Sequence, residues 1–215
     1  LGYTQPNTLA MRNQGGPAMV TASLAYHPTR GTQQSATDTA LVATSFTPDR
    51  FNRRVAENGN DAGNKAWVRN NAGDTTSVTD ARGVVTTITR DNLGRVTSLT
   101  PTASGATSLA YVAGRSDNLL ASMSDGSGST NWSYDTAGRL LTKSQSTGGI
   151  TCSITLTRDS IGRVTRMVYP SGLALDYTYS GDLVTAIVAN GYTLMSNITY
   201  RPFSNVAASW TWGNG

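Results

Sequence analysis

The chain has 215 residues, enough for one large domain or two small ones, and a formal net charge of +4 at pH 7. Lysine occurs only at Lys65 and Lys143 and glutamate only at Glu57, so the charged residues that favour helices are almost absent. The composition, the scattered arginines and the lack of about 18 consecutive apolar residues exclude a mainly helical fold, a basic stripe for nucleic acid and a membrane-spanning helix.

Residues 1–45 are expected to form an N-terminal β region in which no repeat is recognisable. The stretches MVTASLAY (19–26) and TALVATSF (39–46) have the pattern of strands. His27, the only histidine, lies in a Pro/Gly turn, so we expect a turn residue and not a catalytic or metal-binding one. Because the sequence starts at Leu1, we expect a processed chain or a piece of a longer one.

Residues 46–64 have the pattern of a degenerate repeat with a long loop. The segment NGNDAGN (58–64) is rich in oxygen ligands that could hold Ca²⁺. It lacks the Asp-x-Asp-x-Asp-Gly pattern and the final Glu of an EF-hand loop, so a flexible hairpin loop is the favoured interpretation.

A repeat is evident from about residue 69 onward. RDNLGRVTSL (90–99), YDTAGRLLTK (134–143) and RDSIGRVTRM (158–167) are its clear copies. Glycines that mark the turns follow one another at intervals of 19 to 24 residues: Gly73, Gly94, Gly114, Gly138, Gly162 and Gly181. Two strands and two short connections fit that length, so each repeat is predicted to be one hairpin. We therefore predict an all-β fold, with a hairpin array over 46–215 that forms a twisted, coiling antiparallel sheet or partial shell.

The residues of the repeat suit a tight turn. In Asp135-Thr136-Ala137-Gly138 the aspartate and the glycine stand where a type I turn prefers them. Three copies share this Asp-x-x-Gly-Arg pattern, and each arginine could pair with its aspartate: Asp91, Gly94 and Arg95; Asp135, Gly138 and Arg139; Asp159, Gly162 and Arg163. Together with Asp80, these aspartates are expected on one edge of the sheet. Their regular place in turns favours a structural role over the alternative, a pair of catalytic carboxylates for glycoside hydrolysis.

Aromatic and apolar residues alternate with Ser and Thr along the predicted strands, as in SITLTR (153–158). We expect six aromatic side chains to form a core: Trp132, Tyr134, Tyr177, Tyr179, Trp210 and Trp212. A sugar-stacking platform made of these residues other than Tyr134 is the alternative. Cys152 is the only cysteine, so it forms no internal disulfide, and we expect it to be a half-buried packing residue.

These copies of Tyr-Asp-x-x-Gly-Arg-Leu/Val resemble the YD repeats of Rhs-type proteins. Residues 79–100 and 169–187 resemble full units, residues 197–215 resemble a late core segment, and the resemblance spans about 65–215. Two copies depart from the pattern, because Arg90 and Arg158 stand where tyrosine is expected. A third departure is Ser204, which stands where the family usually has glycine.

The resemblance implies a large secreted or cell-surface protein whose repeats form a spiralling β-shell. We expect a non-enzymatic wall segment, or a chain that self-assembles through its strand edges into a filament. An extracellular carbohydrate-binding or cell-contact module is the alternative, and the core of a toxin-enclosing shell is a third possibility implied by the resemblance. The expected partners are copies of the chain, neighbouring repeats of a longer chain or surface glycans. No cofactor, metal, nucleic acid or membrane span is expected.

Overall fold

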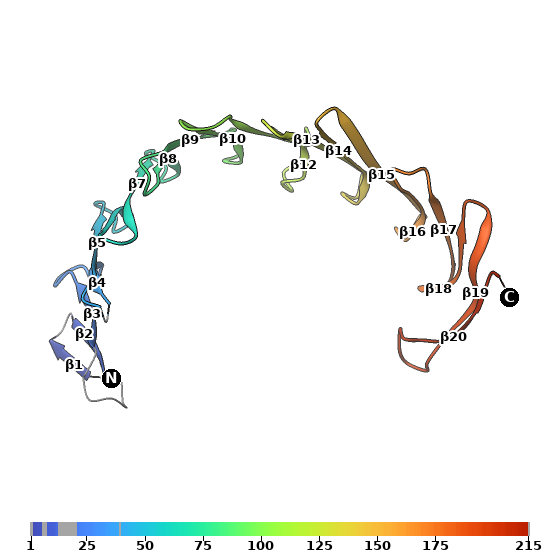
Figure 1. Cartoon of the computed structure of the whole chain (residues 1–215), viewed down its shortest axis with the longest axis horizontal. Coiled ribbons are helices and arrows are strands. Elements are labelled where there is room, and N and C mark those ends of the chain that lie inside the picture. The colour runs from blue at the N-terminus through green and yellow to red at the C-terminus, as the bar shows by residue number, and fades with distance from the viewer. Residues whose placement is uncertain (1, 6–7, 13–20, 39, 215) are drawn as a thin grey trace. The chain divides into compact units, whose positions relative to one another are not determined.

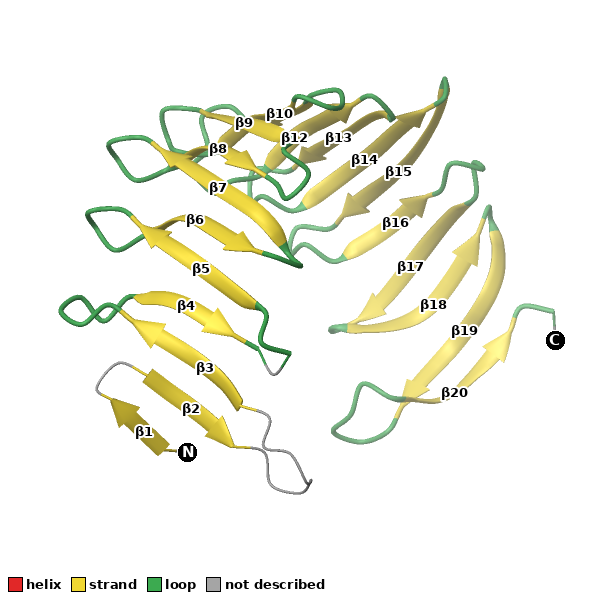
Figure 2. Cartoon of the chain, turned by 60° about the vertical axis from the view of Figure 1, so that its left-hand side comes forward, coloured by secondary structure: helices red, strands yellow, loops and turns green. Residues whose placement is uncertain are grey.

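The computed structural model describes residues 2–5, 8–12, 21–38 and 40–214, and every regular element in them is a β-strand. By compactness the chain divides into unit 1 (Leu1–Thr107) and unit 2 (Ser108–Gly215). Within each unit every strand pairs antiparallel with the next strand in the chain, and Figure 2 shows the resulting succession of hairpins. The predicted all-β array of antiparallel hairpins is confirmed.

Unit 1 contains the first ten strands, blue to green in Figure 1. They are β1 (Gly2–Gln5), β2 (Thr8–Arg12), β3 (Thr21–Tyr26), β4 (Gln33–Thr37), β5 (Ala43–Pro48), β6 (Arg54–Gly59), β7 (Gly63–Arg69), β8 (Thr75–Thr79), β9 (Val85–Arg90) and β10 (Val96–Pro101). Pairing runs without interruption from β4 to β5 and from β5 to β6, so the hairpin pattern continues across residue 45.

Unit 2 contains the remaining strands, green to red in Figure 1. They are β11 (Thr107–Tyr111), β12 (Leu120–Asp125), β13 (Gly128–Tyr134), β14 (Leu140–Thr147), β15 (Ile150–Arg158), β16 (Val164–Val168), β17 (Ala174–Ser180), β18 (Leu183–Ala189), β19 (Tyr192–Tyr200) and β20 (Ala207–Trp212). The register shifts between Ser133 and Tyr134 and again between Thr157 and Arg158, just before the turns that follow β13 and β15. Such bulges increase the twist of the sheet.

Turns lie alternately at the two ends of the strands. We call the turns that follow odd-numbered strands rim A and those that follow even-numbered strands rim B. Asp91, Asp135 and Asp159 follow β9, β13 and β15 and lie on rim A. Asp80 follows β8 and lies on rim B, so the expectation that all four aspartates share one edge is wrong. The physical reason is that Asp80 and Asp91 stand at opposite ends of the same strand, β9.

Burial is shallow in this fold. Among the described residues only Gly59, Thr130, Ala174 and Ile198 are buried, and no large side chain is fully buried. The chain exposes 14060 Å², whereas a compact protein of 22.6 kDa exposes roughly 9,500 Å². A single-layer sheet explains the difference, because neither of its faces has a second layer to pack against.

The expected aromatic core forms only in part. Trp132, Tyr134, Tyr177 and Tyr179 are half-buried on their strands. Trp210 and Trp212 are 42% and 56% exposed, so the expectation that they are core residues is wrong. Both lie on β20, whose partner among the described strands is β19 alone, and a strand with one neighbour buries less of each side chain.

Cys152 is exposed and not half-buried as expected. It lies in the outer part of the hairpin formed by β14 and β15. Because β16 pairs only with Thr155–Arg158, the first residues of β15 have β14 as their single neighbour.

Residues 58–64 also differ from the expected flexible loop. Gly59 pairs with Gly63, and Asn58 pairs with Asn64, so most of the segment belongs to β6 and β7. The connection between β6 and β7 is therefore a short turn and not the expected long loop.

Candidate functional site

The repeated turn of rim A is the feature that recurs most closely, and residues 135–139 show its geometry. The Gly138 backbone N–H donates to the Asp135 carbonyl at 3.0 Å, and the Asp135 N–H donates to the Arg139 carbonyl at 2.9 Å. Gly138 has a φ of 80°, a left-handed conformation that glycine adopts without strain. The result is a three-residue hairpin loop, a type I turn closed by a glycine bulge.

The aspartate side chain stabilises this loop from inside. Asp135 Oδ1 accepts from the Arg139 backbone N–H at 2.8 Å, and Oδ2 accepts from Arg139 Nε at 2.6 Å. The predicted pairs of Arg95 with Asp91 and of Arg163 with Asp159 form in the same way, each with N–O distances of 2.7 Å. The repeated aspartates thus serve their own turns.

These contacts hold the carboxylates in the charged form. For Asp135, the backbone hydrogen bond from Arg139 is the largest influence, and with the Arg139 side chain it lowers the pKa below the usual 3.8. For Asp91 and Asp159, burial is the largest single influence and raises the pKa, but hydrogen bonds from the paired arginine and the backbone outweigh it and leave the pKa lowered. None of these carboxylates is suited to accept a proton near neutral pH.

The structure adds a turn of this type that the sequence pattern missed. Asp49 accepts from the backbone N–H groups of Phe51 and Arg53 at 2.8 and 3.0 Å, and Arg53 pairs with it at 2.7 Å. Asn52 takes the place of the glycine, with a φ of 63°. The Asp-to-Arg spacing of four residues was the available signal, and the absent glycine concealed it.

Arginines of rim A also reach the turn of the following hairpin. The Arg139 guanidinium occupies the place that a Cβ would take at Gly162, and Arg53 lies over Gly73 in the same manner. Arg115 donates to the Thr136 carbonyl at 2.9 Å. Neighbouring hairpins are therefore linked at their turns as well as along their strands.

A second link uses the residue at the end of the strand that enters the turn. The Tyr179 hydroxyl donates to the Val164 carbonyl at 2.7 Å. In the preceding hairpin Arg158 takes this position, and its Nε donates to the Leu140 carbonyl at 3.2 Å. Arg158 at the tyrosine position thus makes the equivalent contact with the preceding hairpin, whereas the buried Nε of Arg90 has no hydrogen-bond partner among the described residues. Arg158 Nη1 also donates to the Gly162 carbonyl, which lies in the turn that follows β15, at 2.8 Å.

The other sequence candidates are not brought together. His27 lies in the turn after β3, where its Nδ1 is 3.3 Å from the Thr29 backbone N–H. The described residues contain no group of three or more His, Cys, Asp or Glu side chains that could hold a metal ion. They also contain no helix that could cross a membrane.

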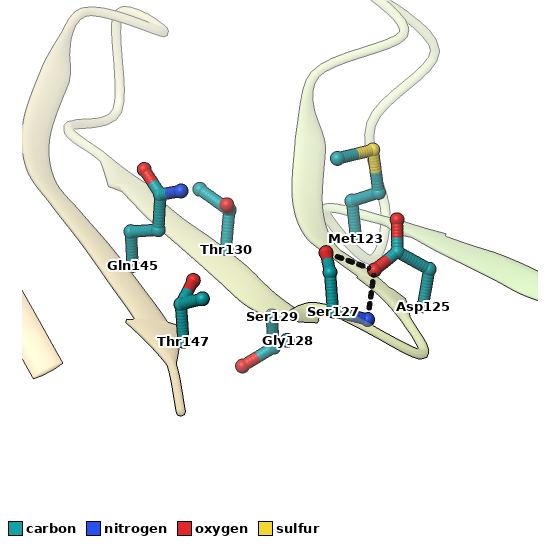
Figure 3. A pocket seen from close by; sticks show the side chains of 8 residues that line it. All are labelled: Met123, Asp125, Ser127, Gly128, Ser129, Thr130, Gln145 and Thr147. Carbon is teal, nitrogen blue, oxygen red and sulfur yellow. Dashed lines mark hydrogen bonds between the residues drawn. The ribbon is translucent and has the colours of Figure 1, made fainter. Parts of the chain in front are cut away.

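A small cavity of about 60 Å³ lies beside the rim B turn between β12 and β13 (Figure 3). Asp125 is the only charged residue in its lining, and it accepts hydrogen bonds from the Ser127 backbone N–H and hydroxyl at 2.8 and 2.6 Å. Those two bonds lower the pKa of Asp125. The cavity is therefore a feature of the turn and lacks a free base or nucleophile.

Comparison with solved structures shows a known fold. The chain is similar to the crystal structure of TcdB2-TccC3 without its hypervariable C-terminal region, with a TM-score of 0.63 and 13% identity over 95% of this chain and 12% of that chain. It is similar at a TM-score of 0.62 and 14% identity to the Photorhabdus luminescens Tc holotoxin pore with the TccC3-D651A mutation, over 95% of this chain and 12% of that chain. The chain shares the fold of a segment of these proteins. It spans about 12% of their length.

No protein-family model matches the chain. No curated protein matches it either.

Proposed function

We propose that this chain is a structural, non-enzymatic repeat protein that forms one stretch of the wall of a Rhs-type shell. The observation that supports this most is the continuous array of linked hairpins, which is similar over nearly all of its length to a segment of TcdB2-TccC3. The YD-like sequence of the turns agrees with that proposal. The proposed location is secreted or at the cell surface.

A non-enzymatic role is supported by the state of the repeated carboxylates. Asp91, Asp135 and Asp159 are each bound to an arginine and to backbone N–H groups of their own turn. A catalytic base needs a carboxylate that is free to take a proton. The oxygens of these carboxylates are instead occupied by hydrogen bonds that stabilise the turns.

The proposed wall grows by strand pairing at β20. Its sequence AASWTW contains no charged residue and no proline, the two devices that usually prevent an edge strand from pairing. The next hairpin would come from a longer chain or from a second copy of this one.

Sedimentation velocity over a range of concentrations tests this pairing in the isolated chain. We expect the sedimentation coefficient to rise with concentration and the Thr211→Lys variant to associate several-fold more weakly, because lysine blocks an edge strand. Thr155→Lys is the matched control, since Thr155 is also exposed but lies in an interior strand. A wild-type chain that stays monomeric at every concentration would contradict pairing through β20.

A carbohydrate-binding module is a second candidate, favoured by the exposed tryptophans of β20. The rings of Trp210 and Trp212 lie 5.8 Å apart in an edge-to-face arrangement, and exposed aromatic faces can stack on sugars. A glycan array supports this candidate if binding is present and is lost in Trp212→Ala. An array without binding counts against it.

A further inference from the structure

One turn of rim A departs from its relatives at positions that the turn geometry leaves free. Arg50 and Phe51 occupy the two loop positions that accept almost any residue in a type I turn. The first of these positions is neutral in the matching turns, where it holds Asn92, Thr136 or Ser160. The second position is apolar in those turns as well, where it holds Leu93, Ala137 or Ile161, so the arginine is the departure that turn formation does not explain.

The two residues form an ordered group with Arg53. The Arg50 guanidinium carbon lies 4.6 Å from the centre of the Phe51 ring, and that of Arg53 lies 5.1 Å from it. Phe51 itself is 61% exposed. Cation–π contacts of this kind hold two guanidinium groups beside one ring and reduce the cost of ordering them when a ligand binds.

A pocket of about 380 Å³ lies between this turn and the next one of rim A. Its lining combines three arginines, one aspartate, two asparagine side chains and the phenylalanine: Asp49, Arg50, Phe51, Arg53, Arg69, Asn70 and Asn71. Positive charge exceeds negative charge, because Asp49 is already paired with Arg53.

Two of the guanidinium groups keep their charge available. Among the ion pairs of the described residues, none includes Arg50 or Arg69. Arg69 Nη1 donates to the Gly73 carbonyl at 3.2 Å and to Thr75 Oγ1 at 3.0 Å, both uncharged acceptors. Its buried Nε has no hydrogen-bond partner among the described residues.

Charge is also distributed unequally between the rims of unit 1. Rim A and the strand ends beside it carry more arginines than aspartates: Arg30, Arg50, Arg53, Arg54, Arg69, Arg90 and Arg95 against Asp49, Asp74 and Asp91. The described part of rim B, with the strand ends beside it, carries more aspartates than arginines: Asp38, Asp61 and Asp80 against Arg12 and Arg82. An anion that approaches unit 1 is therefore attracted to rim A.

We propose that the pocket between residues 49–53 and 69–71 binds an oxyanion group, a carboxylate, sulfate or phosphate. Arg50 and Arg69 supply the charge, and planar guanidinium groups match such oxygens in pairs. The Asn71 side chain adds a neutral donor, and Phe51 gives the bound group an apolar wall. This site is independent of the structural role proposed above.

Isothermal titration calorimetry on the full chain tests the site, with sodium sulfate, sodium phosphate and sodium acetate at ionic strength held constant with sodium chloride. We expect saturable binding of at least one of these anions. Arg50→Ala should weaken that binding about tenfold, because a charge-assisted hydrogen bond is lost. The responding anion distinguishes a carboxylate site from a site for tetrahedral oxyanions.

Arg30→Ala is the matched control, since it removes the same charge from another turn of rim A and should leave the affinity nearly unchanged. Phe51→Ala should weaken binding several-fold, and a far-ultraviolet circular dichroism spectrum checks that each variant folds. Absence of saturable binding by all three anions overturns the proposal. Equal loss of affinity in Arg30→Ala and Arg50→Ala also overturns it, because that result indicates general charge attraction and no defined pocket.

Discussion

At the scale of single residues, Gly162 in a rim A turn meets two requirements. Gly162 has a φ of 99°, and the Arg139 guanidinium occupies the space of its missing side chain. Gly172, in a rim B turn with the same hydrogen bonds, has a φ of 82° but open space around it. A side chain at Gly172 would meet only backbone strain, whereas a side chain at Gly162 would meet the same strain and also the Arg139 guanidinium.

Alanine substitution at these glycines should therefore differ in cost. We expect Gly172→Ala to lower the free energy of unfolding by about 1–2 kcal/mol, the usual penalty of a left-handed alanine. Gly162→Ala should cost about 1 kcal/mol more, because Arg139 must leave its place and its contact is lost. Urea unfolding measures both values. In an Arg139→Ala background the difference between the two variants should disappear, and a difference that persists there would argue against the contact.

The repeated aspartates make stability dependent on acid pH. Their pKa values in the folded chain lie below the usual 3.8, so the unfolded chain binds protons first as the pH falls. The stabilisation is complete above about pH 5, begins to fall as the unfolded chain takes up protons near pH 4, and is lost as the pH falls through the lower folded-state values. We expect urea midpoints to be nearly constant from about pH 7 to pH 5 and to fall below about pH 4.

The Asp135→Asn variant provides the comparison for this pH dependence. Its midpoint should be lower than that of the wild type at neutral pH and should fall less steeply in acid, because one titrating carboxylate is absent. Parallel curves for the two proteins would show that Asp135 does not contribute.

At the scale of the element, three hairpins of unit 2 are each attached to the one before by a donor at the end of their first strand. Tyr179 and Tyr200 supply a hydroxyl for this contact, with distances of 2.7 and 2.9 Å to the Val164 and Val184 carbonyls. Arg158 supplies Nε to the Leu140 carbonyl instead. At these three positions the contact is made by a long side chain with a donor at its end, and tyrosine and arginine both supply that donor.

Substitutions at Arg158 test this interpretation. Arg158→Tyr should retain most of the stability, because the phenol can donate to the Leu140 carbonyl. Arg158→Leu should lower the free energy of unfolding by about 1–3 kcal/mol, because it loses a charge-assisted hydrogen bond and leaves a carbonyl without its partner. Chemical denaturation of both variants gives the comparison, and equal losses in the two would rule out the donor as the essential feature.

At the scale of the whole molecule, the strands of each unit contact only their neighbours in the chain. The described strands make their contacts in consecutive pairs, and few residues are buried. In such an array stability is a sum of local terms and of interfaces between neighbours, and separate regions need not unfold together.

We therefore expect the two units to unfold at different urea concentrations. A variant with Trp132, Trp210 and Trp212 replaced by phenylalanine reports on unit 1 through Trp67. A second variant with Trp67, Trp210 and Trp212 replaced reports on unit 2 through Trp132. The two fluorescence transitions should have different midpoints, and circular dichroism should give a broader transition than either. Coincident curves from all three measurements would indicate one cooperative unit.

The sequence alone determined the hairpin and its repetition, because turn formation is local. Asp135 and Gly138 lie three residues apart, so their contribution to the turn is visible in four consecutive letters. The same reasoning correctly paired Asp91, Asp135 and Asp159 with the arginine that follows the glycine of each turn.

What the tertiary structure decided depends on neighbouring strands, which local patterns do not report. It placed Asp80 on the opposite rim and left Trp210 and Trp212 exposed on a strand with one neighbour. It also placed the Arg139 guanidinium against Gly162, a contact between residues of successive hairpins. Side-chain burial and contacts between turns depend on which strands lie beside one another, and only the folded sheet determines that.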